Sequence, residues 1–89
     1  SFKPDKPPLG IAYKNEILFV TLDGKGEPIL LLNANNGQLI NKIGEGIFER
    51  AHGISVDEES SIWVTDVDAN KIYRLNSAGV VLLIIDGQI

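Results

Sequence analysis

The sequence predicts an all-β chain made of two four-stranded antiparallel sheets. Short runs in which apolar and polar residues alternate are rich in Val, Ile, Thr, Trp and Tyr, as expected for half-buried strands. Clusters of Gly, Asn, Asp and Ser separate these runs and favour turns. The same order of runs occurs twice along the 89 residues, and no stretch shows convincing helical periodicity.

The first predicted sheet begins with a hairpin. Residues 10–13 and 16–21 form its two strands, with a Lys-Asn turn between them. A Gly-rich loop follows, and then the uniformly apolar run 29–33, which is typical of a strand buried on both faces. An Asn-Asn-Gly sequence provides the positive-φ residues of a tight turn into a fourth strand, 38–43.

The second predicted sheet repeats this pattern. Residues 51–57, 61–67 and 70–75 alternate in the manner of consecutive strands of an antiparallel meander. A fourth strand is expected after Gly79.

Aligning the two halves pairs residues 17–21 with residues 62–66. The period falls within about 40–50 residues, which is typical of a four-stranded propeller blade. We therefore interpret residues 9–48 as one blade and residues 49–89 as a second. Residues 1–8 contain three prolines, cannot donate a regular hydrogen-bond ladder and are interpreted as an extended linker.

Two blades leave one apolar face uncovered at each end of the pair, because each blade buries its faces against its neighbours. Uncovered apolar faces of this kind mark association sites. We therefore expect partners in the form of further copies of this chain or of missing propeller blades, and closed rings are the usual symmetric solution.

The composition excludes several classes of function. The formal net charge is −4 and the eight Lys and Arg residues are scattered, so nucleic-acid binding is not expected. No apolar run is long enough to cross a bilayer, and no membrane partner is expected. The chain has no cysteine, which excludes thiolate metal ligands and thiol nucleophiles.

His52 is the one histidine in the chain and begins a predicted inner strand. Two interpretations are open: a structural residue hydrogen-bonded at the junction between the blades, or a metal ligand. Asp57 and Asp66 follow strands, where carboxylates commonly cap backbone N–H groups of turns.

Aromatic residues of the predicted strands are interpreted as packing residues. Trp63 is expected in the core between the blades, and Tyr13 is expected to pack as well. Tyr73 and Arg74 should point to opposite faces of their strand, with Arg74 in solvent.

Short motifs of the second half resemble the NHL repeat, whose proteins are commonly six-bladed propellers. The motifs are residues 53–57, 62–66, Asn70, Ile72 and Gly79. More narrowly, a second set resembles the peptidyl-α-hydroxyglycine α-amidating lyase (peptidylamidoglycolate lyase) family. This set comprises residues 29–36, Phe48, the His52-Gly53-Ile54 motif and residues 63–67.

The lyase resemblance implies a zinc ion held by three histidines and a calcium ion bound partly by backbone carbonyls. His52 matches one zinc ligand, the Ile54 carbonyl matches a calcium contact, and Ile11 matches a second contact in the preceding blade. Residues 21–23 stand where the family has an arginine, and Ala51 stands where a proline often precedes the histidine.

The resemblance also implies a peptide substrate, release of amidated peptide and glyoxylate, and a location outside the cell or in the secretory pathway. Catalytic zinc normally uses three protein ligands, which one copy of this chain does not supply. Three copies would make six blades with three His52 residues around one axis, so lyase activity is expected of a complete ring and not of an isolated monomer. The alternative is a non-catalytic propeller fragment, or a self-assembling NHL module that binds protein or peptide.

Overall fold

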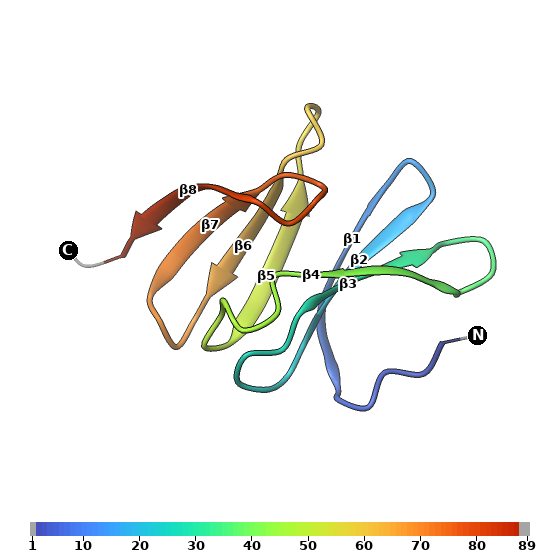
Figure 1. The fold of residues 1–89 in the computed structure, drawn as a ribbon, viewed down its shortest axis with the longest axis horizontal. Coiled ribbons are helices and arrows are strands. Elements are labelled where there is room, and N and C mark those ends of the chain that lie inside the picture. The colour runs from blue at the N-terminus through green and yellow to red at the C-terminus, as the bar shows by residue number, and fades with distance from the viewer. Residues whose placement is uncertain (1, 88–89) are drawn as a thin grey trace.

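The computed structural model describes residues 2–87, which form two antiparallel sheets of four strands each. The first sheet contains β1 (Pro8–Lys14), β2 (Ile17–Leu22), β3 (Ile29–Asn33) and β4 (Leu39–Ile43). The second contains β5 (Ala51–Val56), β6 (Ile62–Asp66), β7 (Lys71–Leu75) and β8 (Val81–Asp86). Each sheet is a meander whose strands lie in chain order (Figure 1).

This architecture confirms the predicted all-β fold class and is consistent with two propeller blades. The turn residues Asn15 and Glu16 both have positive φ, as the tight hairpin between β1 and β2 requires. Among the described residues, no helix is long and apolar enough to cross a membrane.

The two sheets meet along β5, which packs against β1 and β2 near the middle of the molecule (Figure 1). The core between the sheets comes from both halves of the chain, and the Phe48 and Tyr73 rings meet edge to face with centroids 5.1 Å apart. Its buried residues are Phe19, Ile29, Leu31, Ile43, Phe48, Ala51, Ile62, Val64, Tyr73 and Leu75. The continuous core makes the two sheets one packed unit.

Gly10 allows the close approach of the sheets at this seam. A Cβ at this position would overlap the carbonyl oxygen of His52, which is backbone and cannot rotate away. The Thr21 hydroxyl, which is hydrogen-bonded to that carbonyl, would lie 3.1 Å from the same Cβ.

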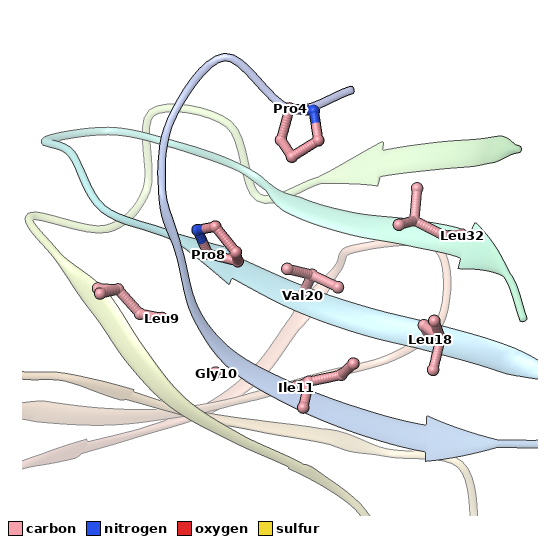
Figure 2. A pocket seen from close by; sticks show the side chains of 8 residues that line it. All are labelled: Pro4, Pro8, Leu9, Gly10, Ile11, Leu18, Val20 and Leu32. Atoms are coloured by element: carbon pink, nitrogen blue, oxygen red, sulfur yellow. The ribbon is translucent and has the colours of Figure 1, made fainter. Parts of the chain in front are cut away.

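The outer face of the first sheet, turned away from β5–β8, is partly covered by residues 2–7. The Phe2 N–H donates to the Gly37 carbonyl at 3.1 Å, and Phe2 packs on an apolar cluster that includes Val20 and Leu30. An open apolar groove of about 420 Å³ runs between this segment and the sheet (Figure 2). Its lining residues are Pro4, Pro8, Leu9, Gly10, Ile11, Leu18, Val20 and Leu32.

The structure also shows which residues occupy equivalent positions in the two sheets. Gly10 lies opposite Thr21, and a Cβ on Gly10 would come within 3.1 Å of the Thr21 hydroxyl. In the second sheet, the Gly53 N–H donates to the Thr65 hydroxyl at 2.8 Å. Gly10 therefore corresponds to Gly53, and Thr21 corresponds to Thr65.

The sequence alignment that paired residues 17–21 with residues 62–66 is consequently wrong by one position, since it matches Thr21 with Asp66. The physical reason is the turn before the second strand of each sheet. Residues 15–16 form this turn in the first sheet, whereas residues 58–60 form it in the second.

Candidate functional site

His52 lies near the beginning of β5, directly after the buried Ala51. Its carbonyl oxygen accepts a hydrogen bond from the Thr21 hydroxyl at 2.7 Å, so its backbone is attached to the first sheet. The imidazole is exposed and makes no hydrogen bond or ion pair within residues 2–87. The residue thus combines a fixed backbone with an available side chain.

A β-bulge explains this geometry. Between Ala51 and Ile54 the β5 strand has one residue more than its partner, and His52 lies within this irregular stretch. The β1 strand has the same irregularity at Leu9, between Pro8 and Gly10. Bulges redirect backbone and side-chain groups, and this one directs the His52 carbonyl towards the neighbouring sheet.

The other two predicted metal contacts lie on the same pair of strands. Ile11 is in β1 opposite Val20, and Ile54 is in β5 opposite Val64. The Ile11 side chain is 64% exposed in the groove, whereas Ile54 packs against the core. Their carbonyl contacts with calcium stay predictions.

A metal centre with three protein ligands does not form within residues 2–87. No group of three His, Cys, Asp or Glu side chains among them could hold a metal ion. One copy of the chain offers the His52 imidazole alone, and this donor set does not fit a three-ligand zinc site by itself.

Asp66 has the structural role predicted for it. The carboxylate is only 1% exposed and accepts hydrogen bonds from the backbone N–H groups of Glu49, Arg50 and Ala69 at 2.8, 2.9 and 3.2 Å. It thereby joins the end of β6 to the segment before β5 and positions the chain entering His52. The buried charge is balanced by these three donors.

Asp57 is also a turn cap, as predicted. Its Oδ1 accepts from the N–H groups of Glu59 and Ser61, each at 2.9 Å, and its Oδ2 accepts from the Trp63 indole at 2.9 Å. The indole bond lowers the pKa of Asp57 from its ordinary value of 3.8, with further lowering from the N–H bonds and from the Arg74 charge, while desolvation opposes the shift.

Trp63 does not lie in the core between the two sheets of this chain, contrary to the prediction. Trp63 alternates with the buried Ile62 and Val64 and therefore lies on the outer face of the second sheet, half-buried. The Arg74 guanidinium lies 5.6 Å from the Trp63 ring centroid, an arrangement that permits a cation–π interaction.

Two other side chains differ from their predictions. Arg74 is not simply in solvent, because its Nε donates to the Ser61 hydroxyl at 3.0 Å and its Nη2 lies 3.8 Å from Glu59 Oε1. Tyr13 is 63% exposed, so the prediction that it is a packing residue is wrong. The prediction that Tyr73 and Arg74 face opposite ways is confirmed, since Tyr73 is in the core.

Sequence reasoning missed the polar contacts that cross the seam. Arg50 Nε donates to Asp23 Oδ1 at 3.1 Å, and Lys14 Nζ donates to the Asp57 carbonyl at 2.6 Å. The first contact places an arginine beside residues 21–23, where the sequence itself has none. No local motif signals it, because the two residues are far apart in the chain.

Comparisons with known proteins give partial matches. No family model matches the chain. It is 32% identical over 50 residues to the peptidylglycine alpha-amidating monooxygenase of Rattus norvegicus, covering 56% of this chain and 5% of that protein. It is 30% identical over 40 residues to the probable peptidyl-alpha-hydroxyglycine alpha-amidating lyase of Caenorhabditis elegans, covering 45% of this chain and 11% of that protein.

A third match, to the peptidyl-glycine alpha-amidating monooxygenase B of Xenopus laevis, has 25% identity over 60 residues. It covers 67% of this chain and 7% of that protein. The chain is thus similar to short parts of amidating enzymes. It spans 5–11% of the length of these relatives.

Proposed function

We propose that this chain contributes two NHL-type blades to a propeller that acts as a peptidyl-α-hydroxyglycine α-amidating lyase. The reaction would release an amidated peptide and glyoxylate. The observation that carries this proposal is the similarity to the rat and nematode amidating proteins. The two four-stranded sheets are compatible with it, because they have the form of consecutive blades.

His52 is the side chain that would take part in this role. Its imidazole is exposed on an inner strand and its backbone is fixed to the neighbouring sheet, which suits a ligand to an ion shared between blades. Zinc, when bound, would supply a Lewis acid that makes the substrate hydroxyl more acidic. The other two zinc ligands would come from further copies or from missing blades.

The proposal also includes a calcium site, a substrate and a cellular location. Calcium would be held partly by the carbonyls of Ile11 and Ile54, which lie on neighbouring inner strands. The substrate would be a peptide ending in α-hydroxyglycine. A secreted or secretory-pathway location accompanies the proposed family.

A glyoxylate-release assay tests the proposal. The purified protein, supplied with zinc and calcium, is incubated with a synthetic peptidyl-α-hydroxyglycine, and glyoxylate is measured against the uncatalysed background. We expect release by the assembled protein and its loss in His52→Ala. Ser55→Ala, an exposed change on the same strand, is the matched control and should stay active.

Two results would contradict the proposal. One is background-level release by assembled protein that has bound zinc. The other is equal release by the wild-type protein and His52→Ala, since the imidazole would then have no part in the reaction.

A non-catalytic module is the second candidate, and the apolar groove on the first sheet favours it. The groove is lined by carbon-rich side chains from residues 4–11 and from β2 and β3, which suits an apolar segment of a protein or peptide. Absence of glyoxylate release from an assembled, zinc-loaded protein would support this alternative.

A further inference from the structure

The contact between the two sheets is a template for a second contact of the same kind. At the seam, the first sheet presents the Thr21 hydroxyl, which donates to the His52 carbonyl, and Gly10, which leaves room for that carbonyl. The first sheet also contributes the side chains of Ile29 and Ile43 to this contact, and they are only 0% and 3% exposed.

The second sheet presents the corresponding residues on its opposite side. We call this surface the back face and define it by Gly53, Trp63, Thr65, Ile72 and Ile85. Trp63 and Thr65 share one face of β6, and Ile72 and Ile85 lie beside Thr65 on the next two strands. Gly53 and Thr65 lie side by side as Gly10 and Thr21 do, and the Thr65 hydroxyl donates only a long bond of 3.5 Å, to the Gly53 carbonyl of its own sheet. Among residues 2–87, no carbonyl of a neighbouring sheet accepts from Thr65 as the His52 carbonyl does from Thr21.

Burial shows that the back face is incomplete. Register places Ile72 and Ile85 opposite each other, as it places Ile29 opposite Ile43 in the first sheet. The first-sheet pair is fully buried at the seam, whereas Ile72 and Ile85 are 37% and 43% exposed. The same positions in the repeat are therefore covered in one sheet and open in the other.

The first sheet carries the complementary half of the contact. We call its outer surface the front face and define it by Leu9, Ile11, Leu18, Val20 and Leu32, all of which line the groove (Figure 2). Leu9 occupies the bulge of β1 that corresponds to the His52 bulge of β5. Ile11 has the position of Ile54, which packs against the core at the existing seam.

We propose that a second copy of this chain docks head to tail, with its front face on the back face of the first copy. The Thr65 hydroxyl of one copy would donate to the Leu9 carbonyl of the next, as Thr21 donates to His52 within a chain. The apolar pair Ile72 and Ile85 would cover Ile11 and its neighbours in the groove. Successive contacts of this heterologous kind close into a ring or extend as a filament.

Residues 2–7 affect the strength of this contact. Phe2 and Pro4 lie over part of the front face, and the Phe2 N–H is bonded to Gly37. Docking requires this segment to move aside, which weakens association relative to an uncovered face. The contact rests on the fold and its repeat, so its success or failure does not depend on the proposed lyase function.

Paired surface variants test the head-to-tail geometry by sedimentation velocity. Ile11→Arg blocks every front face and Ile85→Arg blocks every back face, so each variant alone should sediment at the mass of one chain. An equimolar mixture should form a two-chain complex, because the free back face of Ile11→Arg pairs with the free front face of Ile85→Arg. This complex cannot grow, since both of its outer faces are blocked. The wild-type protein should form larger species.

The controls separate this contact from general loss of folding. Ile84→Arg changes the neighbouring, 51% exposed residue on the other face of β8 and should associate like the wild type. Ile72→Arg provides a second block of the back face if Ile85→Arg fails to fold. Thr65→Val should weaken association about five-fold through the lost hydrogen bond.

Three results would overturn the proposal. They are a one-chain mass for the wild-type protein at its highest soluble concentration, unchanged self-association in Ile11→Arg or Ile85→Arg, and a mixture of these two variants that does not pair.

Discussion

The Thr21 hydroxyl and the His52 carbonyl, 2.7 Å apart, join the first sheet to the strand that carries the proposed metal ligand. Thr21 is fully buried, so the carbonyl has little access to water at this point. The same bond therefore contributes both to the packing of the two sheets and to the position of His52.

Thr21→Val should destabilise the protein by about 1–3 kcal/mol, because it leaves the His52 carbonyl without its donor at the seam. Thr65→Val is the matched control. It removes the corresponding hydroxyl from an exposed position, where water can replace it, and should change stability by less than about 0.5 kcal/mol. Urea unfolding at a concentration where the chain is monomeric measures the free energy of unfolding of both variants. Equal losses would contradict the stabilising role of the bond between Thr21 and the His52 carbonyl.

Asp66→Asn should destabilise the protein by about 1–3 kcal/mol. The amide replaces one acceptor oxygen by a donor, which then faces backbone N–H groups in a buried site. Asp68→Asn, an exposed change in the adjacent turn, should alter stability by less than about 0.5 kcal/mol. Chemical unfolding compares the pair, and a stable Asp66→Asn protein would argue against the capping role.

The pKa of Asp57 should be below 3.8, because the Trp63 indole and the backbone N–H groups of Ser61 and Glu59 favour its charged form. The folded-state pKa is thus lower than the unfolded-state value. This difference contributes stability above the unfolded pKa, and the contribution is lost as the pH falls through the folded pKa.

Trp63→Phe removes the first cause of this shift and should raise the pKa of Asp57 towards 3.8. Carboxyl carbon chemical shifts, followed by NMR during acid titration, measure both values. An unchanged pKa in Trp63→Phe would mean that the indole bond is not what stabilises the charged carboxylate.

The sequence predicted the sheets because their signal is local. Alternating runs such as β6 and turn residues such as Asn15 determine strand and hairpin from neighbouring residues alone. The capping role of Asp57 was predictable for the same reason, since a carboxylate after a strand binds N–H groups nearby in the chain. For Asp66 this holds only for the Ala69 N–H, because the Glu49 and Arg50 donors come from a distant part of the chain.

What the sequence could not predict depends on contacts between distant residues. Alternation shows that Trp63 faces one side of its strand, but which side the other sheet covers depends on tertiary packing. The one-residue error in matching Thr21 arose because turn lengths differ between the sheets. The Arg50–Asp23 bond likewise has no local signature.

The most direct test of the account is the zinc content of the protein measured together with its native mass, by light scattering with elemental analysis of the same fraction. We expect an assembled species carrying about one zinc per three chains, since each three-ligand site takes one imidazole from each of three chains. His52→Ala should keep this mass and lose the metal. An assembled wild-type protein without zinc, or unchanged zinc in His52→Ala, would contradict the assignment of His52 as a ligand.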